Sequence, residues 1–113
     1  IDASNNNVPP VALLVGHGLT IDADNSAVAL AISNSTFNGN TLNGVNMIGE
    51  NMSAFAVSIS GSTFANNTLN GLFVELEDTV GAFALSNNDF NNNTELGAFL
   101  RATDGSLALL ADN

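Results

Sequence analysis

A set of residues that recurs every 26 or 27 positions constrains the fold of this chain more than any other feature. The clearest markers of the period are Phe37, Phe64 and Phe90, and Gly44, Gly71 and Gly97. In both series the first interval is 27 residues and the second is 26. Because two independent markers keep one period, the chain is predicted to be an array of structural repeats that stack on one another.

Alternation of apolar and other residues within each repeat indicates strands. After Gly71, residues 72–77 read Leu-Phe-Val-Glu-Leu-Glu, and similar alternation follows Gly18 and Gly97. A period of two is typical of strands with one buried face, whereas helical repeats place apolar residues at i, i+3 and i+4. Strands that recur one repeat apart and run in the same direction pair in parallel. The sequence therefore predicts an all-β fold, a right-handed parallel β-helix of about four coils of 26–27 residues.

Each coil is predicted to contain two or three short strands. The first follows the marker glycine, the second includes Ala27–Ile32, Ala54–Ile59 and Ala82–Leu85, and a short third strand ends at the marker phenylalanine. Turns rich in Asn and Gly are expected to supply positive φ angles between strands. Besides the marker phenylalanines, the predicted inward columns are Leu19, Val45, Leu72 and Ala98; Ile21, Met47, Val74 and Leu100; Leu30, Val57 and Phe83; and Ile32, Ile59 and Leu85.

Asparagines three residues after each marker phenylalanine are predicted to form a ladder. They are Asn40, Asn67 and Asn93. Stacked amides hydrogen-bond along the axis of such an array. We interpret this column, together with Phe37, Phe64 and Phe90, as a structural ladder and not as a ligand site.

The two ends of the chain are less regular. Gly18 lies 26 residues before Gly44, so it is either the marker before a first strand or, because residues 11–18 resemble residues 98–105, a turn before a second strand. Apolar segments at both ends, Val11–Val15 and Leu107–Ala111, stand where a polar capping repeat is expected. Open strand edges invite pairing, and a head-to-tail contact that does not close makes a filament. We interpret residues 1–113 as one β-solenoid domain that is a segment of, or a unit in, a longer solenoid.

The charge of the chain excludes two classes of partner. Eleven acidic residues and one cation, Arg101, give a formal net charge of −10. Nucleic acids and anionic lipid surfaces both attract Lys and Arg, so neither is an expected partner. The chain has no cysteine, which excludes disulfides and Cys metal sites. No apolar run approaches the ~20 residues of a membrane helix, and membrane insertion is not expected.

Carboxylates are predicted to line one outward column. Asp24, Glu50 and Glu77 each lie six residues after a marker glycine, and Glu75 and Asp78 lie beside Glu77. We interpret them as a solvated acidic face. The alternatives are a calcium site built from these oxygen ligands and a carboxylate pair for glycoside hydrolysis. No cofactor other than calcium is considered.

Two aromatic side chains are predicted to face outward in another column. Phe73 and Phe99 each lie two residues after a marker glycine, next to Asn46. Outward stacked aromatics hold a sugar ring or pack against another chain, and the alternative is that a loop or a flanking domain covers them. Glu75 and Arg101 each lie four residues after a marker glycine, so they are expected to pair on adjacent coils as a surface ion pair.

A short motif in the repeats resembles that of a known family. Residues 34–37 read Asn-Ser-Thr-Phe, residues 62–64 read Ser-Thr-Phe, and each marker phenylalanine is followed three residues later by Asn. In this respect residues 27–103 resemble the right-handed β-helix passengers of bacterial surface proteins. The polymorphic outer-membrane proteins are the closest pattern, and pectate-lyase-like β-helices are more distant. The resemblance implies a secreted or surface-displayed protein that acts as an adhesin or a structural stalk.

No residue of the chain is predicted to be catalytic. The serines lack a partner base, basic clusters of the lyase type are absent, and His17 between two glycines is interpreted as a turn residue. We therefore expect a non-enzymatic extracellular or cell-surface element, structural or adhesive, that stacks head to tail into a filament or stalk. Glycans, or a host or neighbouring surface, are its other expected partners. The alternatives are a carbohydrate-binding module and a remnant of a polysaccharide-acting β-helix enzyme.

Overall fold

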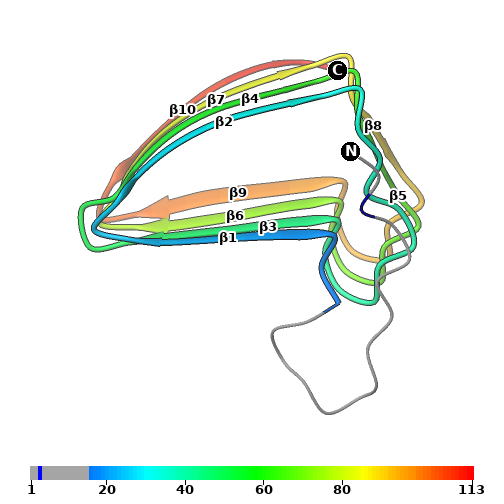
Figure 1. Ribbon diagram of the computed structural model, residues 1–113, viewed down its shortest axis with the longest axis horizontal. Coiled ribbons are helices and arrows are strands. Elements are labelled where there is room, and N and C mark those ends of the chain that lie inside the picture. The colour runs from blue at the N-terminus through cyan, green and yellow to red at the C-terminus, as the bar shows by residue number, and fades with distance from the viewer. Residues whose placement is uncertain (1–2, 4–15) are drawn as a thin grey trace.

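The computed structural model describes residue 3 and residues 16–113, and Figure 1 shows them as a stack of coils. The predicted strand at Val11–Val15 lies outside the described residues. Within the described part every regular element is a β-strand, and strands of successive coils pair in parallel. The all-β parallel β-helix of about four coils is therefore confirmed. In Figure 1 the chain runs clockwise while later coils lie farther from the viewer, which makes the solenoid right-handed.

The first sheet contains the strand that follows each marker glycine. Its strands, in order across the sheet, are β1 (Leu19–Asp24), β3 (Val45–Glu50), β6 (Leu72–Glu77) and β9 (Ala98–Thr103). Leu19 pairs with Val45, and Val45 pairs with Leu72. This register places Gly18 directly before the first strand, equivalent to Gly44, and so decides between the two assignments that the sequence left open.

The second sheet contains the strand that follows in each coil. Its strands are β2 (Ala27–Ser33), β4 (Ala54–Ser60), β7 (Val80–Ser86) and β10 (Ser106–Asp112), in the order β10-β7-β4-β2. In the third coil the strand includes the predicted Ala82–Leu85 and begins two residues earlier, because Val80 pairs with Ala54 and Gly81 with Phe55. Gly81 interrupts the apolar alternation in the sequence. In the structure a Cβ there would lie 2.5 Å from Cδ1 of Leu76, which fills the space.

The third side of the solenoid is narrower. β5 (Thr63–Ala65) pairs with β8 (Asp89–Asn91), and in the preceding coil only an isolated bridge joins Thr36 to Thr63. The short third strand was predicted to end at the marker phenylalanine. It continues one residue further, because Ala65 pairs with Asn91.

The first coil differs from the others in the length of one connection. The backbone N–H of Ala3 donates to the carbonyl of Thr36, just as the N–H of Phe37 donates to the carbonyl of Thr63. Ala3 therefore takes the position of the marker phenylalanine in the first coil. Ala3 and Gly18 are 15 positions apart, against 7 for Phe37 and Gly44, so this connection is eight residues longer.

The core is a set of columns that run along the axis between the sheets. Phe37 stacks on Phe64 with ring centroids 5.2 Å apart, and Phe64 stacks on Phe90 at 4.8 Å. Phe37 and Phe64 are fully buried, whereas Phe90 in the last coil is partly exposed. Phe55, for which no inward position was predicted, is also buried, and its ring lies 6.4 Å from that of Phe83.

The marker glycines are required by close approach of the coils and not by positive φ. A Cβ at Gly44 would lie 2.6 Å from the carbonyl oxygen of Gly71, closer than carbon and oxygen atoms approach. Positive φ in the described turns falls mainly on Asn and Asp, which tolerate the left-handed conformation. The non-glycine residues with positive φ are Asn25, Asn34, Asn51, Met52, Asn66, Asp78, Asn87, Asn92 and Asp104.

Replacement of the central stacked ring should destabilise the whole array. Phe64→Ala removes a fully buried ring that has a neighbour on both sides, and we expect it to lower the free energy of unfolding by about 3–5 kcal/mol. Phe90→Ala is the matched control, because that ring has one described ring neighbour and is partly exposed. Urea denaturation followed by circular dichroism measures both. Equal losses for the two variants would contradict this account of the core.

Candidate interaction surfaces

The predicted asparagine column is a continuous hydrogen-bonded ladder in the structure. The main-chain N–H and the side-chain Nδ2 of Asn40 both donate to Oδ1 of Asn67, at 3.0 and 2.9 Å. Asn67 donates in the same way to Oδ1 of Asn93, at 3.1 and 2.9 Å. Nδ2 of Asn67 also donates to the carbonyl of Phe37, which ties the ladder to the core. Asn40 and Asn67 are buried, so the column lies inside the wall and offers no ligand site at these two residues.

Two further polar columns were not predicted from the sequence. In one, the N–H of Ser35 donates to Oγ of Ser62, the N–H of Ser62 to Oδ1 of Asn88, and the N–H of Asn88 to Oδ1 of Asn113. In another, the N–H of Ser26 donates to Oγ of Ser53. Within the described part of the chain, no buried side-chain nitrogen or oxygen lacks a hydrogen-bond partner. A search of the sequence for polar residues at 25–27-residue intervals, regardless of type, could have found these columns.

His17 is a member of a further ladder and not only a turn residue. The N–H of Asn43 donates to Nδ1 of His17 at 3.1 Å, and the N–H of Asn70 donates to Oδ1 of Asn43 at 2.9 Å. The imidazole therefore takes the place of an asparagine in the first coil. This bond requires a lone pair on Nδ1, which protonation would remove. Burial lowers the pKa of His17 from its ordinary value of 6.5, so the ring is neutral at pH 7.

The predicted aromatic patch lies on the outward side of the first sheet. Phe73 and Phe99 pair in register on β6 and β9, and their rings stack with centroids 5.1 Å apart and an interplanar angle of 11°. Asn46 pairs with Phe73 in register from the preceding coil, and its Oδ1 accepts from Nδ2 of Asn43. All three patch residues are half-buried. Stacking covers one face of each ring, so the patch presents ring edges and the second face of Phe99.

The carboxylates on this sheet lie as the period implies, at the end of each strand. Asp24 pairs in register with Glu50, and Glu77 is level with Thr103. Asp24 accepts a hydrogen bond from Nδ2 of Asn51 at 2.7 Å. Among the described residues, no group of three or more His, Asp or Glu side chains is arranged to hold a metal ion. Calcium at Asp24, Glu50, Glu75, Glu77 and Asp78 is therefore not taken further.

The expected ion pair is present on the same sheet. Arg101 on β9 and Glu75 on β6 are in register, and Nη2 of Arg101 contacts Oε1 of Glu75. The carboxylate-bearing column to which they belong runs Asp22, Ile48, Glu75 and Arg101 through the four coils. Arg101 is the one cationic side chain of the sequence, and it stands in the last coil of this column.

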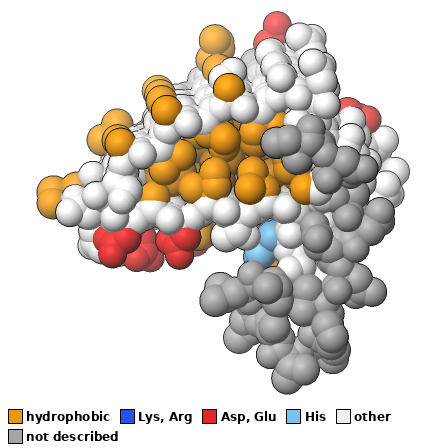
Figure 2. Space-filling view, in the orientation of Figure 1, with side chains coloured by type: hydrophobic (Ala, Val, Ile, Leu, Met, Phe, Trp, Pro, Cys, Tyr) orange, Lys and Arg blue, Asp and Glu red, His pale blue; other side chains and the backbone are white. Residues whose placement is uncertain are grey.

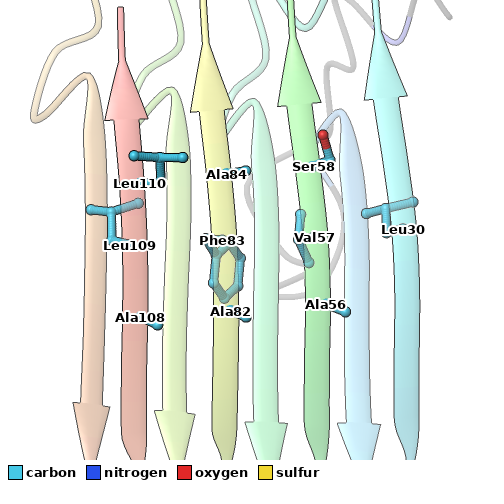
Figure 3. Close-up of a pocket in the computed structure, with 10 residues that line it drawn as sticks. All are labelled: Leu30, Ala56, Val57, Ser58, Ala82, Phe83, Ala84, Ala108, Leu109 and Leu110. Atoms are coloured by element: carbon cyan, nitrogen blue, oxygen red, sulfur yellow. The ribbon is translucent and has the colours of Figure 1, made fainter.

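The outward side of the second sheet carries a single carboxylate, Asp112, at the end of β10, level with Ser86. We call the remainder of this side, which has no charged residue, the uncharged face. Its residues are Ala27, Ala29, Ala31, Ser33, Ala54, Ala56, Ser58, Ser60, Val80, Ala82, Ala84, Ser86, Ser106, Ala108 and Leu110. A shallow groove of about 560 Å³ runs over it, and Figure 3 shows the residues that line the groove. The sequence signal was the alternation Ala-Val-Ala-Leu-Ala-Ile in residues 27–32.

Comparisons with known proteins do not assign a family to this chain: no family model, no curated protein and no solved structure matches it. The resemblance to polymorphic outer-membrane proteins therefore stays a prediction. The structure supports only the parallel β-solenoid fold that this resemblance implied. In residue 3 and residues 16–113 there is no helix with the length and apolar character needed to cross a membrane.

Removal of the central ladder amide should destabilise the coils. Asn67→Ala removes the acceptor of two buried donors of Asn40, and we expect a loss of about 1–3 kcal/mol of unfolding free energy for each donor left without it. Asn91→Ala, an exposed asparagine on β8, is the control and should change stability by less than about 0.5 kcal/mol. Thermal melts compare them, and similar losses in both would count against the ladder.

Stability should depend on pH through His17. Because the pKa is lower in the folded protein than in the unfolded chain, the unfolded chain binds the proton first as the pH falls. The stabilisation is complete above about pH 6.5 and is lost progressively as the pH falls from 6.5 toward the folded-state pKa. Melting temperatures between pH 7.5 and 5.5 measure this. His17→Asn keeps an acceptor at every pH, so it should remove the dependence in this window, and an unchanged dependence would show that another group causes it.

Proposed function

We propose that the chain is a non-enzymatic structural solenoid, outside the cell or on its surface, whose copies stack head to tail into a filament or stalk. The observation that carries the proposal is the distribution of charge in one column. Asp22 in the first coil and Arg101 in the last coil occupy the same column on the outward side of the first sheet. A second copy stacked in phase on the last coil would bring its Asp22 next to Arg101.

The strand edges of the last coil support axial stacking. Among the described strands, β9 pairs only with β6 and β10 only with β7, so each has an edge without a partner strand. The inward side chains of this coil are incompletely covered. Leu109 is 49% exposed, whereas Phe83 in the same column one coil earlier is 3% exposed. An added coil would bury the apolar surface of the last coil as each inner coil buries that of its neighbour.

The first coil offers matching apolar columns. Leu19, Ile21, Val28 and Leu30 are partly buried and pack against the core from the first coil. Figure 2 shows apolar side chains between the two sheets at this end of the solenoid. In an in-phase stack Leu100 would meet Ile21, and Leu109 would meet Leu30, because each pair shares a column. Stacking would thus place apolar side chains of one copy against apolar side chains of the next, as between the coils of a single copy.

The aromatic rings of the last coil fit the same arrangement. The outer faces of Phe90 and Phe99 have no described ring beyond them. In an in-phase stack the methyl group of Ala3 would lie over Phe90, because Ala3 takes the marker phenylalanine position in the first coil. Apolar contact on an aromatic face is favourable, and the small side chain leaves room for the approach.

A carbohydrate-binding patch at Phe73, Phe99 and Asn46 is the second candidate function. The observation that favours it is the outward, half-buried position of a stacked aromatic pair on a soluble acidic surface. Glycan-array binding that is lost in a Phe73→Ala/Phe99→Ala double variant would support this function. A double variant with unchanged glycan binding and unchanged assembly would exclude the patch from both functions.

Charge reversal in the Asp22 column should weaken the stacking. Asp22→Arg would place two cations together at each junction, and we expect the dissociation constant for axial association to rise about fivefold to tenfold. Asp24→Arg is the matched control, because it makes the same charge change on the same strand in a column that ends at the neutral Thr103. Analytical ultracentrifugation with negative-stain electron microscopy measures rod formation.

A second pair of variants tests the interior of the junction. Leu100→Lys puts a charge into the apolar end surface and should abolish rods, whereas Thr103→Lys, outward on the same strand, should leave them. Rods whose repeat equals a whole number of coils are the expected wild-type result. Wild-type protein that stays at the mass of one copy at every concentration would overturn head-to-tail stacking.

A further inference from the structure

The uncharged face has an apolar hollow and projecting apolar side chains, so its shape is complementary to that of a second copy. Its groove lies over β4 and β7, where Ala56, Ala82 and Ala84 leave a hollow lined almost entirely by apolar atoms. Beside the hollow two larger side chains stand out from the face. Leu110 on β10 is 72% exposed, and Val80 on β7 is 58% exposed. A surface with both a projecting apolar side chain and an apolar hollow can be complementary to itself about a two-fold axis.

The charge distribution selects a second copy as the occupant. The chain carries a net charge of −10, so two copies repel each other wherever their carboxylates meet. The described carboxylates lie on the first sheet, in the turns and on the third side, except for Asp112, which stands at one corner of this side of the solenoid, at the end of β10 and level with Ser86. Figure 2 shows apolar side chains along the edge formed by β2, β4, β7 and β10, with acidic atoms at one end of that edge and further acidic groups along the opposite edge. A cationic partner would find one counter-charge, at a corner, whereas an identical copy centred on Ala82 would meet an apolar surface away from Asp112.

The size of the face sets the strength of the contact. Four strands about 4.8 Å apart, with seven residues at about 3.3 Å each, cover about 440 Å². Two copies would therefore bury about 900 Å², below the roughly 1,200–2,000 Å² of stable complexes. One pair of chains should associate weakly and reversibly. The contact grows with every coil that axial stacking adds, because the same columns of small side chains continue along the rod.

We propose that the uncharged face packs against the same face of a second copy, sheet on sheet, and so joins solenoids side by side. This contact is separate from head-to-tail stacking, because it uses the outward side of the second sheet and leaves β9, Asp22 and Arg101 free. In a filament it would pair two rods laterally. In protein whose ends are blocked it would give a species of two copies and no larger one.

Sedimentation equilibrium of the Leu100→Lys protein tests the proposal with the axial contact blocked. The expected result is a monomer–dimer equilibrium that stops at two copies and shifts toward dimer as NaCl is raised, since salt screens the repulsion of two acidic chains. Ala82→Glu, at the centre of the face, should abolish the dimer, and Thr20→Glu, outward on β1, should preserve it. Both positions are exposed, and circular dichroism verifies that each variant is folded.

Cross-linking locates the contact independently. The sequence contains no cysteine, so Ala82→Cys or Thr20→Cys introduces a single thiol. A short bismaleimide should link the Ala82→Cys protein into dimers and leave the Thr20→Cys protein monomeric. A protein that stays monomeric up to millimolar concentration at high salt, a dimer that Ala82→Glu does not weaken, or equal cross-linking at both positions would overturn the proposal. Wild-type protein that forms no rods but still forms a two-copy species would instead overturn only the axial contact.

Discussion

Contact between equivalent residues of successive coils, about 4.8 Å apart along the axis, is the constraint on which the rest of this structure depends. A column is stable only if each side chain packs against, or hydrogen-bonds to, the equivalent side chain of the next coil. Phenyl rings satisfy this by stacking, as Phe37, Phe64 and Phe90 do. Primary amides satisfy it because each both donates and accepts, as Asn40 and Asn67 do. These two residue types therefore dominate the interior corners of the coil.

Two carboxylates at adjacent positions of a column repel each other, and this repulsion explains where the carboxylates lie. In the column of Glu75, the next residue along the axis is Arg101 on one side and the neutral Ile48 on the other. Asp24 and Glu50 do meet as neighbours, but at the exposed end of their strands, where water screens the repulsion. The second sheet has one outward carboxylate, Asp112, and its neighbour along the axis is the neutral Ser86.

The same axial contact connects the proposed assembly with the fold. An end coil exposes the surface that every inner coil buries, and the column shared by Asp22 and Arg101 gives the two ends opposite charge. The uncharged face extends in register along every coil, so axial growth enlarges it. For this protein with one Arg and no Lys, the two surfaces at which we propose that copies associate are the ends and the second sheet.

Intervals in the sequence by themselves determined the solenoid, the inward columns, the asparagine ladder, the stacked Phe73 and Phe99, and the pairing of Glu75 with Arg101, because in a solenoid the repeat period is the register of the sheets. Tertiary structure decided what intervals of identical residues cannot show. His17 stands in an asparagine column, Asn88 follows Ser62 in another, and Gly81 follows Phe55 in the core. The structure also decided that the marker glycines serve close approach and that one side of the solenoid carries a single carboxylate, Asp112, at its corner. The physical reason is that a column requires compatible contacts from one coil to the next and not identical residues, so only the positions in space reveal which residues share it.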